Sequence, residues 1–382
     1  MAHAAAFVGI GTGIENLTVG EASFDTLRES WDALLPSAIT PFPFQSIGWA
    51  EAWFRVFGGD AQPLLLAIRD EAGALIGIAP FALQQTALGR TVRLMGGDDV
   101  TDYLDIIAAE RDVPRVWRAV VDYLLSIRGQ WDAIDLHCLP HWSPSHETVA
   151  LLLSETLYVR TVQEEVCPVV PLGGSFDAYL RALPKKERHE VKRKARNFER
   201  DAPSGTLRLL TDRDDALAAL PDFFRLHRLS APDKERFLTP AVEAFFRAMT
   251  GAMADAGRLR LSFLDVENEP VAAMFTFAAD GRLLVYNSGF DPAFARISVG
   301  MVLTGLVIED AANSGLALCD FLRGNETYKY RFGASDTPIW RVIASDDRGG
   351  VDRAVAETKA RFQMAADDRD LTDEERATEE RS

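Results

Sequence analysis

The chain has 382 residues, of which 47% are hydrophobic and 26% are charged, a composition typical of a folded globular protein and not of a disordered or fibrous one. This length exceeds what one hydrophobic core usually serves, so two domains are predicted. The formal net charge of −16 argues against a general DNA-binding or RNA-binding protein, because neutralising phosphates requires an excess of Lys and Arg.

The opening residues are not expected to form the leader of an exported protein. The opening MAHAAAFVGIG has no Lys/Arg-rich start, and no apolar run approaches the roughly 20 residues needed to span a bilayer. The cysteines, Cys138, Cys167 and Cys319, are widely spaced and form no CxxC pair, which indicates buried reduced thiols. No histidine falls in a metal-binding spacing such as HExxH. We therefore predict a cytoplasmic protein without a metal.

The first half of the chain has the pattern of an α/β domain. Hydrophobic periodicity and turn residues predict a strand at 17–19, helices at 22–34 and 44–57, strands at 62–69, 75–83, 91–95 and 103–108, a helix at 113–127 and a strand at 132–137. In the second of these helices Trp49, Trp53 and Phe57 recur at i, i+4 and i+8. They form one aromatic face, which core packing explains best.

A basic segment separates the two halves. Residues 183–200, LPKKERHEVKRKARNFER, hold eight Lys or Arg against three Glu. The segment contains no Gly, and its single Pro184 lies where a first helical turn tolerates proline, so a helix is predicted at 184–200. A solvated helix with i, i+4 pairs such as Glu190 and Lys194 is as consistent with this pattern as an anion-binding helix.

The second half repeats the order of the first. Helices are predicted at 215–229 and 239–254, strands at 258–265, 270–278 and 282–288, a helix at 298–313 and a short strand ending at Phe321. Setting Asp70 on Asp265 aligns AIRDEAGALIGIAPF with SFLDVENEPVAAMFT, a strand, an acidic turn and a second strand in each copy. We predict one lobe at 1–172, a second at 173–345, and an acidic C-terminal helix or tail at 346–382, whose last stretch from residue 365 is expected to fray.

A helix start in the second half is a candidate ligand site. The strand ending near Asn287 leads through a Gly/Asp/Pro turn into the helix at Ser298. Unpaired N–H groups at a helix start attract anions, and small residues such as Ser298 and Gly300 let a phosphate approach the backbone. An ordinary serine N-cap is the alternative.

The segment after the last strand concentrates polar side chains within a dozen residues. In α/β folds, sites form where strands end, although a charged surface loop is equally consistent with the pattern. The candidate residues are Asp320, Arg323, Glu326, Tyr328, Lys329 and Arg331.

Four segments together resemble a known family, the CelD/BcsL-like acetyltransferases, which are related in fold to the FemAB peptidyltransferases. They are FQSIGWAEAWF at 44–54, LPKKERHEVKRKAR at 183–196, YNSGFDPAFARISVGMVL at 286–303 and DFLRGNETYK at 320–329. The resemblance extends over residues 40–345. It implies two tandem GNAT-like lobes, each with a mixed, mostly antiparallel sheet flanked by helices.

The resemblance also implies an acyl-CoA site in the second lobe. Acetyl-CoA is the expected co-substrate, with its pyrophosphate on the backbone of Ser298, Val299, Gly300 and Met301. The usual phosphate loop of the superfamily has two glycine positions, whereas the corresponding stretch 296–301 supplies only Gly300.

Acyl transfer requires a neutral acceptor amine, a stabilised oxyanion and a protonated leaving thiolate. By residue type and location, Tyr328 is assigned as the acid, Asp320 as the base or orienting group, and Lys329 as an electrostatic stabiliser or phosphate ligand. We assign the acceptor contacts to three further residues, with structural salt bridges as the alternative for the two charged ones. These residues are Asn287, Arg323 and Glu326.

The resemblance further implies a role in bacterial exopolysaccharide synthesis, such as that of capsule, holdfast or a cellulose-like polymer. The expected acceptor is an amino sugar on a sugar nucleotide or a lipid-linked precursor, reached by the basic helix, with peripheral contact to the inner membrane face or to polysaccharide assembly proteins. Two alternatives stay open. One is a FemAB-like transferase that uses aminoacyl-tRNA, and the other is a non-catalytic scaffold in a polysaccharide assembly system.

Overall fold

The computed structural model describes residues 8–9, 17–97 and 99–379, with side chains from residue 17 to residue 365. The chain divides into two compact units. Unit 1 comprises Met1–Glu165 and Pro338–Ala365, and unit 2 comprises Val166–Thr337 and the C-terminal residues from Ala366. The predicted second lobe extends to residue 345, which differs from this division. Residues 338–345 belong to unit 1 because their strand pairs with a strand of that unit.

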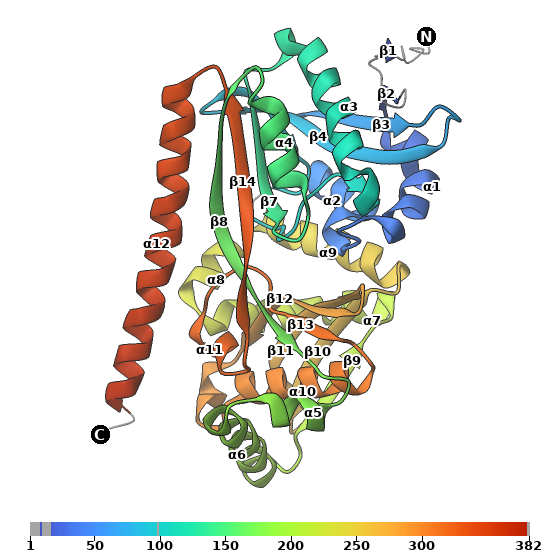
Figure 1. Cartoon of the computed structure of the whole chain (residues 1–382). Helices are drawn as coiled ribbons and strands as arrows, with labels where there is room; N and C mark the ends of the chain where they lie inside the picture. The colour runs from blue at the N-terminus through green and yellow to red at the C-terminus, as the bar shows by residue number, and fades with distance from the viewer. Residues whose placement is uncertain (1–7, 10–16, 98, 380–382) are drawn as a thin grey trace. The chain divides into compact units, whose positions relative to one another are not determined.

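Unit 1 is built on a mostly antiparallel sheet with the order β1-β2-β3-β4-β5-β7-β14, and β6 pairs with β4. Its elements are β1 (Val8–Gly9), β2 (Thr18–Ala22), α1 (Phe24–Leu34), η1 (Leu35–Ser37), η2 (Pro43–Gln45), α2 (Ile47–Phe57), β3 (Gln62–Arg69), β4 (Leu75–Thr86), β5 (Gly89–Leu94), β6 (Ile107–Ala108), η3 (Glu110–Asp112), α3 (Val113–Ser126), η4 (Arg128–Gln130), β7 (Ala133–Pro140), α4 (Ser145–Leu153) and β14 (Ser335–Ser345) (Figure 1). The helix predicted from residue 44 begins at Ile47 because the Ser46 hydroxyl accepts the N–H of Trp49 and caps it.

The sheet strands of unit 2 have the order β8-β13-β12-β11-β10-β9. Its elements are β8 (Tyr158–Pro171, of which Val166 onward lies in this unit), α5 (Phe176–Ala182), α6 (Lys185–Asp201), β9 (Thr206–Leu210), α7 (Arg213–Ser230), α8 (Pro232–Phe237), α9 (Pro240–Asp255), β10 (Leu259–Val266), β11 (Glu269–Ala279), β12 (Arg282–Phe290), η5 (Pro292–Ile297), α10 (Val299–Asn313), β13 (Leu318–Asp320) and α11 (Thr327–Tyr330). The predicted basic helix is α6.

The two units repeat one architecture. In unit 1, β3 and β4 form an antiparallel hairpin, and β5 crosses over through α3 to the parallel strand β7. In unit 2, β10 and β11 form the hairpin, and β12 crosses over through α10 to the parallel strand β13. The predicted fold class, two tandem GNAT-like lobes with mostly antiparallel sheets flanked by helices, is therefore confirmed.

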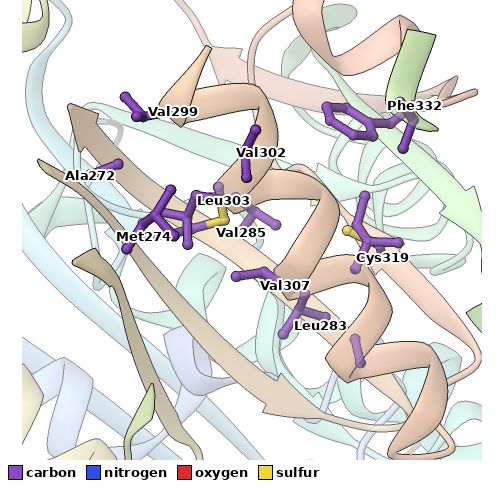
Figure 2. Packing of buried hydrophobic residues seen from close by; sticks show 14 of the residues in the cluster. Ala272, Met274, Leu283, Val285, Val299, Val302, Leu303, Val307, Cys319 and Phe332 are labelled. Atoms are coloured by element: carbon purple, nitrogen blue, oxygen red, sulfur yellow. The ribbon is translucent and has the colours of Figure 1, made fainter. Parts of the chain in front are cut away.

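Alternation along the strands of unit 2 buries both faces of its sheet. Met274, Leu283 and Val285 pack against Val302 and Leu303 of α10 (Figure 2). The helix α10 is apolar on nearly every side because α5 and α6 cover its outer surface. This packing fixes the start of α10 beside the end of β12.

The other face of this sheet carries an aromatic cluster. Phe275 of β11 and Tyr286 of β12 contact Phe246 of α9, and Phe275 also contacts Phe223 of α7. All three phenylalanines are fully buried. Aromatic pairs of this kind, two of which are edge-to-face, add to the free energy of burial and hold α7 and α9 on the sheet.

The core of unit 1 contains the predicted aromatic face, with Trp49 and Trp53 buried. One predicted strand of this unit is shorter than expected. The strand predicted at 103–108 is reduced to Ile107–Ala108, because only that pair of residues pairs with β4. In the segment 346–382, predicted as an acidic C-terminal helix or tail, α12 extends over Arg348–Glu379, and residues 380–382 lie outside the described residues. None of the described helices is long and apolar enough to cross a membrane.

Candidate active site in unit 2

A cavity of about 610 Å³ lies in unit 2, where α10 begins. It is lined by residues of α6, α8, β11, β12, η5, α10 and the α11 segment, and by residues at the junction of α7 and α8. They are Lys194, Ser230, Ala231, Lys234, Ala273, Met274, Ser288, Gly289, Phe290, Ala295, Ser298, Val299, Gly300, Met301, Leu303, Thr304, Tyr328 and Arg331. The four residues predicted as the pyrophosphate cradle are among them.

The cavity opens where two parallel strands separate. The pairing of β12 with β13 ends at Leu284 and Asp320, whereas β12 continues to Phe290. The chain after β13 continues along β8, since the N–H of Phe321 bonds to the carbonyl of Pro168. The last residues of β12 therefore have β11 on one side and an unpaired edge on the other. Ligands of open α/β sheets bind at such carboxyl ends.

The start of α10 presents free backbone donors to this cavity. Ser298 adopts a left-handed conformation with φ of 56° and makes no side-chain cap. Among the described residues, the N–H groups of Val299, Gly300 and Met301 have no hydrogen-bond acceptor. A Cβ on Gly300 would lie 3.5 Å from Phe290, an ordinary contact, so the backbone here is open to a ligand. This geometry suits an anion.

Two cations, Lys194 and Arg331, line the cavity together with these donors. The Lys194 ammonium lies 3.0 Å from the Ser298 hydroxyl and 3.6 Å from a carboxylate oxygen of Glu190. Burial lowers the pKa of Lys194, and the charge of Arg331 acts in the same direction against the opposing effect of Glu190. Three cationic side chains and no carboxylate occur among the described residues that line the cavity, in a chain whose net charge is −16.

The third cation is Lys234 of α8. Its ammonium donates to the backbone carbonyl of Ser288, at 2.6 Å, and lies 3.4 Å from the hydroxyl of the same residue. Burial lowers the pKa of Lys234 to about 8. The contact with Ser288 places the Lys234 ammonium at the unpaired edge of β12.

Tyr328 of α11 is the one predicted catalytic residue that lines the cavity. Its ring packs edge-on against Phe321, with ring centroids 6.0 Å apart. Its hydroxyl has no hydrogen-bond partner in the part of the chain that the structure describes. Burial raises the pKa of Tyr328, so the hydroxyl is protonated at neutral pH and can donate a proton.

The other two predicted catalytic residues lie outside the cavity lining. Asp320 is fully buried, accepts the N–H of Leu322 at 2.9 Å and lies 3.5 Å from the Arg282 guanidinium. The Lys329 ammonium donates to the carbonyls of Arg323 and Gly324, at 2.7 and 2.9 Å. Both residues hold the turn after β13 in shape, and their catalytic roles stay predictions.

The predicted acceptor contacts are not brought together in the cavity either. The Asn287 amide oxygen accepts the Nε2–H of His227, at 2.8 Å, so this side chain is directed toward α7. Glu326 lies 2.8 Å from the Lys329 ammonium. Burial opposes ionisation of Glu326, but the charges of Lys329 and Lys234 outweigh it and keep the pKa of this carboxyl below its usual value. Arg323 contributes its carbonyl to Lys329.

Sequence reasoning missed the three cations of the cavity as a group. One signal was available for Lys194, because it lies three residues after Val191 and four before Phe198, the two buried positions of α6. That spacing places Lys194 on the inner face of the helix. Lys234 and Arg331 carry no such periodic signal, since each lies on or beside a helix of at most six residues.

Comparisons with known proteins agree with the fold of this unit. Residues 185–330 match a family model described as an acetyltransferase (GNAT) domain. A comparison with curated proteins gives no match. Unit 2 therefore carries a GNAT-type acyltransferase fold around the cavity.

Three solved structures share the fold at low sequence identity. FemX aligns with a TM-score of 0.62 and 11% identity, over 85% of this chain and 96% of that chain. A C-terminal domain assigned to a lysylphosphatidylglycerol synthetase from Agrobacterium fabrum gives 0.54 and 11%, over 88% and 96%. L-PGS from Bacillus licheniformis gives 0.52 and 11%, over 84% and 92%. At these identities the likeness concerns the fold alone.

Proposed function

We propose that this protein is an N-acyltransferase that takes an acyl group from acetyl-CoA, or a related acyl-CoA, and transfers it to an amino sugar. The observation that carries the proposal is the cavity lining, which combines free helix N–H groups with three cations and no carboxylate among the described residues. A GNAT-type fold around such a cavity fits a polyanionic acyl donor.

The residues present fit the two ends of acyl-CoA. Its pyrophosphate would lie on the N–H groups of Val299, Gly300 and Met301, with Lys194 and Arg331 as counter-charges. Its uncharged arm would lie against the apolar side of the lining, which Ala273, Met274, Phe290 and Leu303 supply. Small-molecule sites commonly combine an apolar wall with a few placed polar groups.

The donor supplies a thioester, which an amine can attack at the carbonyl carbon. A C–N bond forms and the C–S bond breaks, so the amine must lose one proton and the leaving thiolate must gain one. The Tyr328 hydroxyl is protonated, lines the cavity and has no competing partner among the described residues. We assign it the proton that the thiolate takes, and the proton released by the amine restores the hydroxyl.

The acceptor class follows from the resemblance to CelD/BcsL-like acetyltransferases. Helix α6 supports an anionic precursor, because Lys185, Lys192 and Arg196 are exposed at spacings of seven and four residues along one side of it. A sugar nucleotide or a lipid-linked sugar pyrophosphate of exopolysaccharide synthesis has the matching charge. Contact with the membrane face or with polysaccharide assembly proteins belongs to the same proposal.

A second candidate function is a transferase that uses aminoacyl-tRNA in place of acyl-CoA. The exposed basic side of α6 favours it, because it would attract an RNA backbone as well as a sugar pyrophosphate. A non-catalytic scaffold is the remaining alternative. Donor binding separates the three.

The test is isothermal titration of the whole protein with acetyl-CoA, beside the variant Gly300→Trp. The indole of this variant would occupy the cavity at the start of α10. The control is Leu209→Trp, on the edge strand β9, where the side chain is 36% exposed. We expect micromolar binding by the parent and by Leu209→Trp, and its loss in Gly300→Trp. If the folded parent binds no acetyl-CoA but does bind charged tRNA, the second candidate replaces the first. Binding of neither donor favours the scaffold.

A further inference from the structure

The environment of the Lys234 ammonium is unusual for a lysine with a purely structural role. It is half-buried at the edge of the cavity, and its ammonium contacts only the carbonyl and the hydroxyl of Ser288. No carboxylate lies within ion-pair distance of it among the described residues. Burying a cation without an ion-pair partner lowers the stability of the fold. Charged groups in such costly environments are common at functional sites.

The fold holds this ammonium in place through Gly289. A Cβ at Gly289 would overlap the backbone of His227, so the end of α7 lies directly on β12 only because this residue is glycine. The hydrogen bond between His227 and Asn287 ties the same two elements together. The turn from α7 into α8 therefore starts from a fixed point on β12, and Lys234 extends from this turn to Ser288, the residue before Gly289.

The carbonyl that Lys234 contacts belongs to the unpaired edge of β12. Because Leu284 is the last residue of β12 that pairs with β13, Ser288 lies beyond the point where the two strands separate. A thioester that extends along this edge brings its carbonyl oxygen to the same ammonium. The ammonium then exchanges one carbonyl acceptor for another.

We propose that Lys234 is a catalytic residue, whose ammonium donates a hydrogen bond to the thioester carbonyl oxygen and stabilises the oxyanion formed when the amine adds. This inference rests on the proposed acyl-transfer function. The carbonyl π electrons move to oxygen as the C–N bond forms, and they return as the C–S bond breaks. The thiolate takes its proton from Tyr328, so Lys234 stays an ammonium throughout. A fixed positive donor at this oxygen lowers the barrier because it requires no reorganisation.

The charged and titratable groups around Lys234 decide the pH range in which it acts. Glu326 and Lys329 of the α11 segment affect it in opposite directions, and His227 of α7 is buried and neutral because burial lowers its pKa to about 4. Burial dominates and lowers the pKa of Lys234 to about 8. The stabilising charge is therefore lost as the pH rises through about 8.

The experiment compares the parent with Lys234→Met, which keeps length and removes charge, and with Lys234→Arg, which keeps charge at every accessible pH. Transfer from acetyl-CoA to hydroxylamine, a small surrogate amine, is followed by release of the CoA thiol, and donor affinity is measured by titration. We expect Lys234→Met to lower kcat about 100-fold and to leave the Kd for acetyl-CoA within threefold. The alkaline limb near pH 8 should vanish in Lys234→Arg. Lys359→Met, an exposed site on α12, is the matched control.

Contrary results separate this inference from the proposed function. A Lys234→Met protein with an unchanged kcat and the parent pH profile would show that Lys234 only ties α8 to β12. Loss of acetyl-CoA affinity at an unchanged kcat would make it a donor-binding group and would also overturn the inference. If Lys234→Met does not fold, persistence of the alkaline limb in Lys234→Arg decides against it. Failure of the parent to bind acetyl-CoA overturns the proposed function, and this inference with it.

Discussion

The buried charge network of unit 1 should make the unfolding free energy of this unit fall at alkaline pH. His137 lies between two carboxylates, with Nδ1 2.5 Å from Glu164 and Nε2 3.1 Å from Asp135. Asp135 also accepts two hydrogen bonds of 2.8 Å from Arg341, and Glu164 accepts the N–H of Cys138. Burial alone would lower the pKa of His137, but the two carboxylate charges outweigh it and raise the pKa to about 9. The imidazolium is thus part of the folded structure.

The sign of the effect follows from the raised pKa. The folded state binds the proton more tightly than the unfolded state, whose histidine titrates near 6.5, so the stabilisation is complete below pH 6.5 and is lost as the pH rises through 9. The rise from 6.5 to about 9 corresponds to about 3 kcal/mol of unfolding free energy. Asp135 has the opposite dependence, because the charges of His137 and Arg341 outweigh burial and lower its pKa. Its contribution is lost in acid.

The seven tryptophans of the chain all lie in unit 1, so tryptophan fluorescence reports the unfolding of this unit alone. Urea unfolding at pH 6 and at pH 9.5 should show a decrease of about 3 kcal/mol in the parent. His137→Gln removes the titrating group, and its unfolding free energy should change much less over the same interval. Parallel pH dependence of the two proteins would refute the reasoning.

Three further predictions concern unit 2. Removing one charge at the helix start, in Lys194→Ala or Arg331→Ala, should weaken acetyl-CoA binding about tenfold or more, because a charged hydrogen bond contributes about 1.5–3 kcal/mol. Isothermal titration measures the affinity, and affinities equal to that of the parent would place the donor elsewhere. Tyr328→Phe should slow transfer at least 100-fold and leave the Kd for acetyl-CoA unchanged, and a normal rate would exclude it as the acid. Gly289→Ala should destabilise unit 2 by about 1–3 kcal/mol in unfolding followed by circular dichroism, because the added methyl overlaps the His227 backbone; parent stability would contradict that overlap.

The position of the helix start that carries the donors could be predicted from local pattern. The strand, the Gly/Asp/Pro turn and the long apolar helix are all features of neighbouring residues, and the structure places them at β12, η5 and α10. Ser298 differs in detail. The pattern predicts a serine N-cap as one possibility, but Ser298 adopts a left-handed conformation and its hydroxyl contacts Lys194, on a helix about a hundred residues earlier.

The sequence could not show which polar residues after β13 line the cavity and which only hold the turn. Asp320, Tyr328 and Lys329 are equally suited to chemistry by residue type. The structure turns Tyr328 into the cavity and uses Asp320 and Lys329 to hold the turn, because a buried carboxylate or ammonium must find donors or acceptors close to it. Which partner each one finds depends on the path of the backbone and not on residue type.

The sequence by itself determined the repeated order of elements, because hydrophobic periodicity and turn residues act over short stretches of chain. Only the tertiary structure decided where the cations gather. Lys194, Lys234 and Arg331 come from three separate helical segments, and nothing in their local patterns relates one to another. Their meeting results from the packing of α6 on α10 and of α7 on β12, which brings distant positive charges to one helix start.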